Sequence, residues 1–175
     1  MTTITISGTP GSGKSTVARK LRNKLDLEYV YSGMIFRDMA KKHDMTLSEF
    51  GDYCEKNPEI DKELDKKQLN ILKKDNIIVE GRLAGWLTYQ NEISAFKIML
   101  DADIDTRAKR IVKREGGNVK QRKKEMINRE KSEAKRYKNY YSIDITDKSI
   151  YDLVIDTSDK PPDEIVEIIL QNLDE

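Results

Sequence analysis

The chain reads Thr3-Ile-Thr-Ile-Ser7 and then Gly8-Thr-Pro-Gly-Ser-Gly-Lys-Ser15, and this stretch decides the fold. The first five residues are β-branched or small and carry no charge, which favours a buried parallel strand. The next eight match the pattern GxxxxGK[ST]. Behind them, Val17, Leu21 and Leu25 recur at four-residue spacing, as on the apolar face of a helix. The order of strand, glycine-rich loop and helix predicts a phosphate-binding loop.

Each part of this loop suits the binding of a nucleoside triphosphate. The glycines allow backbone amides and the helix N-terminus to approach the β-phosphate closely. Lys14 is expected to reach the β- and γ-phosphates, and the Ser15 hydroxyl to ligate Mg²⁺. The alternative is a glycine-rich turn that only ends a strand. We expect ATP or GTP to contact Gly8, Thr9, Pro10, Gly11, Ser12, Gly13, Lys14, Ser15 and Thr16.

Strand and helix patterns alternate along the rest of the chain, which predicts an α/β fold. Further strands are expected at 28–31, 76–80, 96–100 and 153–156. Helices are expected after Ser32-Gly33, from Thr46, and over 58–74, 105–114, 120–141 and 162–173. Residues 115–118 interrupt two of these helices with a pair of glycines.

Composition points to one compact domain without a membrane span or a metal cluster. The 175 residues include 32 Lys and Arg against 31 Asp and Glu, so the whole chain is not a polycation that would bind nucleic acid or membranes. Cys54 has no cysteine partner for a disulfide, and His43 is the only histidine that could join it in a zinc site. No window approaches the roughly 18 apolar residues of a membrane span. We expect a cytoplasmic protein.

Several arginines follow predicted strands or share a helix face, where they could grip phosphate. Arg37 lies about one helical turn beyond the second strand, and Arg82 directly follows the third strand in Glu80-Gly-Arg82. Ligands of open α/β sheets bind at that edge. Arg129 and Arg136 share one helix face with a carboxylate between them. A guanidinium can bind two phosphate oxygens at once, although exposed arginines are the simpler interpretation.

Several blocks of the sequence together resemble the archaeal-type cytidylate kinases, a branch of the nucleoside monophosphate kinases. Besides the phosphate-binding loop, they are Ser-Gly-x-x-Phe-Arg at 32–37, Pro-Glu-Ile-Asp at 58–61, Glu-Gly-Arg-Leu-Ala-Gly-Trp at 80–86, Arg-Glu-Lys-Ser-Glu-Ala-Lys-Arg-Tyr at 129–137 and Ile-Tyr-Asp-Leu-Val at 150–154. The likeness runs nearly from end to end.

The resemblance implies a three-layer sandwich with a central five-stranded parallel sheet in a single domain, residues 1–175. The core would comprise residues 1–31, 75–113 and 129–175, with a helical monophosphate-binding insertion at 32–74 and a mobile lid at about 114–128. The implied reaction moves the γ-phosphoryl group of ATP to CMP or dCMP with Mg²⁺. We expect a monomer with no stable nucleic-acid partner.

The same resemblance assigns roles to individual side chains. Ser32, Arg37 and Arg82 would hold the CMP phosphate. Arg110, Arg129 and Arg136 would surround the transferring group, and Lys14 of the loop is expected to be catalytic as well.

Base recognition is where the sequence departs from the related bacterial-type enzymes. Those enzymes carry an Asp after the equivalent Gly-Arg that reads cytosine, and here Leu83 takes that place. Cytosine offers an N4 donor and an N3 acceptor, so other residues must face them. Asp61, Asp65 and Gln68, one turn apart on the insertion helix, are candidates, and they are equally consistent with the surface of an amphipathic helix.

Two other functions are compatible with parts of the sequence. Adenylate or shikimate kinase activity would use the same loop with a different acceptor. A nucleotide-dependent RNA-binding module would use residues 120–141 as a basic arm, with Tyr137, Tyr140 and Tyr141 stacking on bases.

Overall fold

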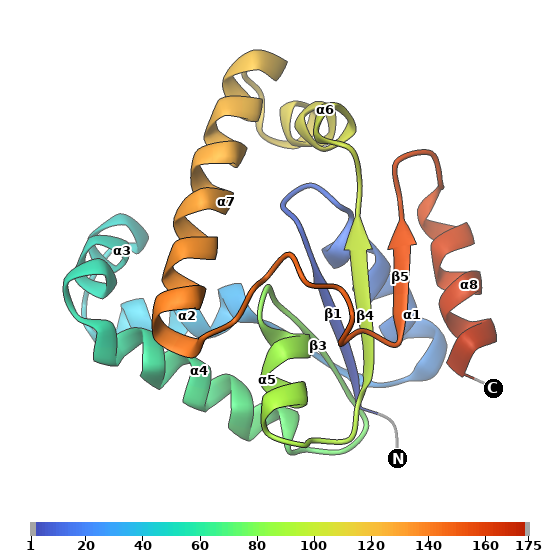
Figure 1. The fold of residues 1–175 in the computed structure, drawn as a ribbon, viewed down its shortest axis with the longest axis horizontal. Helices are drawn as coiled ribbons and strands as arrows, with labels where there is room; N and C mark the ends of the chain where they lie inside the picture. Colours follow the sequence, from blue (N-terminus) through green and yellow to red (C-terminus); the bar gives the residue numbers. More distant parts are fainter. Residues whose placement is uncertain (1–2, 174–175) are drawn as a thin grey trace.

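The computed structural model describes residues 3–173, which form one five-stranded sheet with helices on both faces (Figure 1). The strands are β1 (Ile4–Gly8), β2 (Glu28–Tyr31), β3 (Ile77–Glu80), β4 (Phe96–Asp101) and β5 (Leu153–Asp156). They pair in the order β2-β3-β1-β4-β5, and each pairing is parallel. The predicted α/β fold with a five-stranded parallel sheet is confirmed.

Apolar side chains fix the layers of this sandwich. On one face, helices α1 (Lys14–Leu25) and α8 (Pro162–Leu173) pack on the sheet through Val17, Leu21 and Ile169 against Ile6 and Ile98, all of which are buried. The opposite face is covered by α5 (Ala84–Gln90) and by the segment at residues 143–151 that leads into β5. The inner strands β1 and β3 are therefore buried along their whole length, which explains their continuous apolar runs, whereas the edge strands β2 and β5 are partly exposed.

Helix α5 is an element that the sequence patterns did not indicate. It has seven residues, begins after Leu83 without a side-chain cap, and includes Gly85. A helix of two turns is too short to display the 3.6-residue period on which sequence prediction depends. Its formation follows from packing, since Trp86 and Leu87 are buried against the sheet.

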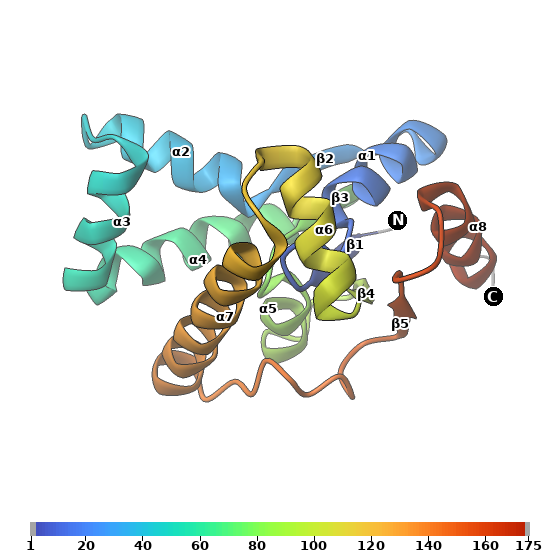
Figure 2. The same ribbon diagram turned by 90° about the horizontal axis from the view of Figure 1, so that it is seen from above.

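Three helices extend from the carboxyl side of β2 and lie away from the sheet (Figure 2). They are α2 (Ser32–Lys42), α3 (Leu47–Lys56) and α4 (Pro58–Leu72). Thr46 caps α3 through a reciprocal capping box with Glu49, and Pro58 occupies the first turn of α4. These helices enclose a separate apolar cluster centred on Phe50, which is fully buried.

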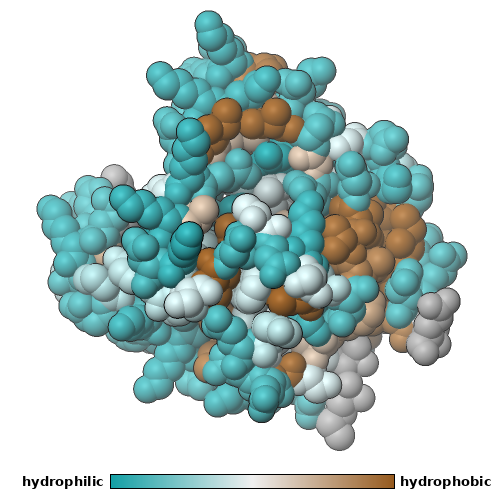
Figure 3. Space-filling view, viewed as in Figure 1, coloured by the Kyte–Doolittle hydropathy of each residue, from teal (hydrophilic) through white to brown (hydrophobic). Residues whose placement is uncertain are grey.

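Two further helices stand over the carboxyl ends of the strands. Helix α6 (Ile104–Glu115) leads through Gly116 and Gly117, both at positive φ, into the long α7 (Val119–Tyr141). Helix α7 runs down towards α4, so the strand ends lie beneath a helical arch (Figure 1). The face seen in Figure 3 is mainly hydrophilic. Within residues 3–173, no helix is both long enough and apolar enough to cross a membrane.

Replacing Phe50 with Ala should destabilise the insertion helices. The Phe50 ring packs 4.9 Å from the Phe36 ring and 5.5 Å from His43, and its removal leaves a cavity. We expect a loss of about 3 kcal/mol or more in the free energy of unfolding. Urea unfolding would measure it, with the exposed Lys56→Ala at the end of α3 as the control. Equal stability of the two variants would contradict this packing.

Candidate active site

The phosphate-binding loop between β1 and α1 is held in shape by contacts from two sides. Gly11 and Gly13 adopt φ values of 78° and 93°, which favour glycine. A Cβ added to Gly11 would lie 2.8 Å from the Arg107 carbonyl oxygen, so α6 packs directly on the loop. From beyond β5, the Thr157 hydroxyl donates to the Ser12 carbonyl at 2.8 Å. The loop is therefore fixed from both neighbouring elements.

The two functional side chains at the end of the loop have defined partners. The Lys14 Nζ donates to the Thr9 carbonyl at 2.9 Å, which curls the side chain over its own loop. Burial, and then the positive charge of Arg82, lower the pKa of Lys14 to about 8. The Ser15 hydroxyl donates to Glu80 Oε1 at 2.8 Å, and the Tyr29 hydroxyl donates to the other oxygen of that carboxylate.

These oxygen atoms suit a small divalent cation that also binds phosphate. Mg²⁺ prefers oxygen ligands and is commonly held by one or two protein groups, substrate phosphates and water. The Ser15 hydroxyl and the Glu80 carboxylate provide such a pair at the mouth of the loop. Residues 3–173 contain no cluster of three or more acidic, His or Cys side chains that could hold a metal alone. The pair formed by Ser15 and Glu80 therefore fits a cation that is held together with a nucleotide.

A buried carboxylate on α7 binds two of the predicted phosphate-gripping arginines. Glu133 is 7% exposed and pairs with Arg82 Nη2 at 2.8 Å and with Arg129 Nε at 2.9 Å. Arg82 also donates to the Gly8 carbonyl at 3.2 Å, so its guanidinium lies beside the first glycine of the loop. The end of β3, the loop and α7 thus meet at one cationic centre.

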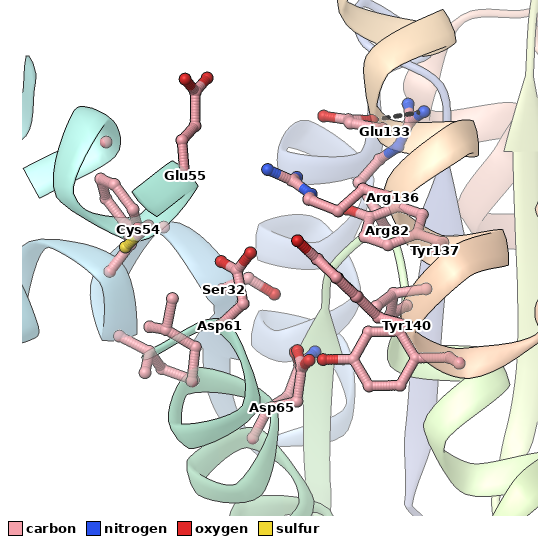
Figure 4. A pocket seen from close by; sticks show the side chains of 18 of the residues that line it. Ser32, Cys54, Glu55, Asp61, Asp65, Arg82, Glu133, Arg136, Tyr137 and Tyr140 are labelled. Atoms are coloured by element: carbon pink, nitrogen blue, oxygen red, sulfur yellow. Dashed lines mark ion pairs between the residues drawn. The ribbon is translucent and has the colours of Figure 1, made fainter. Parts of the chain in front are cut away.

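A cavity of about 510 Å³ opens from this centre between α4 and α7. Side chains from the two helices face each other across it (Figure 4). The phosphate end is polar, and Phe36, Leu64 and Tyr140 contribute apolar and aromatic wall. The cavity brings together most of the predicted acceptor and transfer residues, namely Ser32, Asp61, Asp65, Arg82, Arg129 and Arg136.

The acidic residues of α4 in this cavity have perturbed ionisation. Burial, and then the charge of Asp61, raise the pKa of Asp65 to about 7. Burial also raises the pKa of Asp61, while Arg136 across the cavity opposes that shift. Perturbed carboxyl groups in a cleft are typical of functional sites, since a surface helix has no reason to bury them.

Like the residues of the phosphate-binding loop, the predicted residues Arg37 and Arg110 do not line this cavity. The exposed Arg37 donates to the Tyr31 hydroxyl at 2.8 Å. Arg110 lies on the other side of the loop, where it donates to the Gly11 carbonyl at 3.2 Å and to Thr157. Thr16 is exposed in the first turn of α1. Phosphate contact by these side chains, as by the other predicted residues, stays a prediction.

The structure also reveals residues that sequence reasoning did not assign. In the sequence, Glu80 is recognisable only as part of a block at a strand end, although its position at the end of β3 could indicate a partner for Ser15. Arg107 is buried, donates to the Pro10 carbonyl and pairs with Glu130 at 2.8 Å. Neither Arg107 nor Thr157 stands in a recognisable motif, because their partners are remote in sequence.

The fold and the phosphate-binding loop define an α/β protein of the P-loop class, with a five-stranded parallel sheet. Similar solved structures include the shikimate kinase of Bacteroides thetaiotaomicron, with a TM-score of 0.67, 12% identity and 99% of both chains covered. An uncharacterised protein from Eubacterium ventriosum gives a TM-score of 0.75 at 21% identity, covering 100% of this chain and 99% of its own. At these identities the likeness concerns the fold alone.

Sequence comparison defines the family more narrowly. Residues 3–159 match the model of the cytidylate kinase-like family, and the chain belongs to that family. Cytidylate kinase of Pyrococcus furiosus is 47% identical over 171 residues, which cover 98% of this chain and 88% of the relative. Cytidylate kinase of Methanocaldococcus jannaschii is 45% identical, with 98% and 97% covered. The family resemblance inferred from the sequence blocks is confirmed.

The lowered pKa of Lys14 predicts a proton-linked affinity for ATP. Above about pH 8 the free enzyme loses the ammonium charge, so ATP affinity should fall and binding should take up a proton. Calorimetric titrations near pH 8 in buffers of different ionisation enthalpy would measure the uptake. Lys14→Arg, whose side chain stays charged, is the control. Equal uptake by both proteins would contradict the assignment.

Proposed function

We propose that this enzyme acts as a cytidylate kinase, transferring the γ-phosphoryl group of ATP to CMP or dCMP to give ADP and CDP or dCDP. The observation that carries the proposal is the cavity between α4 and α7, which joins the phosphate-binding loop through Arg82. Its position next to the loop provides room for a second nucleotide, and the 47% identity to a cytidylate kinase supports the choice of acceptor.

On the donor side, the loop amides and Lys14 bind the β- and γ-phosphates of ATP. Lys14 leaves the Thr9 carbonyl, its partner at 2.9 Å, to reach these oxygens. Ser15 and Glu80 would hold Mg²⁺, which would offset the negative charge of the phosphate oxygens. Arg107 and Arg110 keep the loop in place from α6.

On the acceptor side, Arg82 and Ser32 bind the CMP phosphate. Ser32 donates to the Glu80 carbonyl at 3.2 Å, and this contact places its hydroxyl at the end of β3 beside Arg82. Arg37 joins them by turning away from Tyr31. Catalysis of phosphoryl transfer depends mostly on positioning and charge compensation. Arg129 and Arg136 therefore act by stabilising the negative charge of the phosphoryl group during its transfer.

The acceptor site and the closing segment follow the predicted division of the chain. Residues 32–74 form the monophosphate-binding insertion, and residues 114–128 form a lid that closes over the donor. Gly116 and Gly117 between α6 and α7 provide a hinge, because glycine can change its backbone dihedral angles with little steric penalty. Closure excludes water, which would otherwise accept the phosphoryl group. We further propose that the enzyme is a cytoplasmic monomer.

A panel of acceptors tests the proposed reaction. With Mg²⁺ and ATP, coupled assays should show phosphorylation of CMP and dCMP well above that of AMP and shikimate at equal concentration. Arg82→Lys keeps the charge but loses the planar fork, so KM for CMP should rise about 10-fold or more. The exposed Arg22→Ala on α1 is the control. Absence of turnover with every pyrimidine monophosphate would refute the proposed function.

A further inference from the structure

Helix α4 buries an amide that neither the phosphate-binding loop nor the arginine cluster uses. Gln68 is 4% exposed and lines the cavity, and its Nε2 has no hydrogen-bond partner among residues 3–173. A Cβ on Gly81 would lie 2.8 Å from this nitrogen and 2.1 Å from the Ser32 hydroxyl. The amide therefore lies at the phosphate end of the cavity. A buried donor without a partner is costly, and it suits an acceptor that arrives with a ligand.

Asp65 lies on the same face of α4, further from the sheet. Asp65 and Gln68 are three positions apart in the helix, which corresponds to about 4.5 Å along its axis. That separation is about the width of the hydrogen-bonding edge of a pyrimidine. Asp61 follows one turn beyond, and both carboxylates line the cavity (Figure 4). With increasing distance from Gly81, α4 thus presents a hydrogen-bond donor, the Gln68 amide, followed by two acceptors, the carboxylates of Asp65 and Asp61.

Building on the proposed function, we propose that Gln68 and Asp65 read the base of the acceptor nucleotide. The Gln68 Nε2 donates to the O2 and N3 edge of cytosine, next to the ribose, and the Asp65 carboxylate accepts a hydrogen bond from the 4-amino group. Uracil presents an oxygen at that place, and two acceptors facing each other repel. Selection of cytosine thus depends on the carboxylate of Asp65.

The ionisation of Asp65 makes this selection dependent on pH. A neutral carboxylic acid can donate to the uracil oxygen, whereas the carboxylate cannot. Burial and Asp61 raise the pKa of Asp65 to about 7, and Arg136 on α7 favours the carboxylate. The other titratable or charged groups that line the cavity are Asp52, Cys54 and Glu55 of α3, Arg82 after β3, and Arg129, Glu133, Tyr137, Tyr140 and Tyr141 of α7.

The measurement is the ratio of kcat/KM for CMP to that for UMP between about pH 6 and pH 8. Titration of the acceptor phosphate, with a pKa of about 6, affects both nucleotides alike and cancels in the ratio. In the wild type the ratio should rise several-fold as Asp65 ionises. In Asp65→Asn, whose amide can donate to uracil, the ratio should fall about 10-fold at pH 8 and lose its pH dependence. Asp61→Asn, one turn away, should keep a rising ratio.

Thermal stability separates this role from a structural one. Because folding raises the pKa of Asp65 from 3.8 to about 7, the carboxyl group destabilises the folded protein progressively as pH rises through that window. Asp65→Asn should therefore have a higher Tm than the wild type at pH 8 and a smaller difference at pH 5. The exposed Glu63→Gln on the same helix should change neither Tm nor the ratio. A structural role alone would change Tm and leave the ratio intact.

Gln68→Met completes the test by removing the donor with little change in volume. Since O2 is common to both bases, kcat/KM should fall about 10-fold for CMP and also fall for UMP. If Asp65→Asn phosphorylates CMP with an unchanged CMP to UMP ratio, the inference is wrong and the proposed function stands. If the wild type phosphorylates no pyrimidine nucleotide, the proposed function itself is wrong.

Discussion

The cations that must grip two phosphorylated molecules repel one another, and the structure depends on the carboxylates placed among them. Glu133 lies between Arg82 and Arg129, and Glu80 accepts the Ser15 hydroxyl next to Lys14. Removing one partner of a buried ion pair typically costs about 3–5 kcal/mol, because the other charge is left uncompensated. Glu133 thus allows an arginine cluster to exist before substrate arrives. Phosphate oxygens then compete with the Glu133 carboxylate for the same guanidinium groups. These guanidinium groups therefore need little reorganisation when substrate binds.

Helix α7 links this charge balance to the shape of the phosphate-binding loop. Glu130 and Glu133 are three residues apart and hence neighbours on one helical surface. Glu130 holds Arg107, which donates to the Pro10 carbonyl of the loop, while Glu133 holds Arg82 at the end of β3. A displacement of α7 would alter both contacts together. Helix α7, whose first turns belong to the proposed lid, is therefore placed to couple closure over the donor with the position of the acceptor cations.

Sequence reasoning predicted the parts of the molecule that depend on local patterns. The β1 strand, the loop and the helix start at Thr46 are all legible within a few residues. Helix α5 was missed because only its packing on the sheet sustains it, and Arg107 and Thr157 because their partners lie far away in sequence. The sequence indicates which arginines could bind phosphate, but it does not indicate where they lie. Only the tertiary structure separates the arginines around Glu133 from Arg110, which binds the loop from its other side.

Helix α4 illustrates why an amphipathic pattern alone could not decide between surface and site. Asp61, Asp65 and Gln68 recur at helical spacing, which would equally suit a solvated face. In the structure that face is turned towards α7 across a cavity, and Gln68 is buried while the pKa of Asp65 is raised. Burying these groups without partners lowers the stability of the folded protein. An apolar α4 would be more stable and would close the gap to α7, so the polar face makes physical sense only if a polar molecule occupies the cavity.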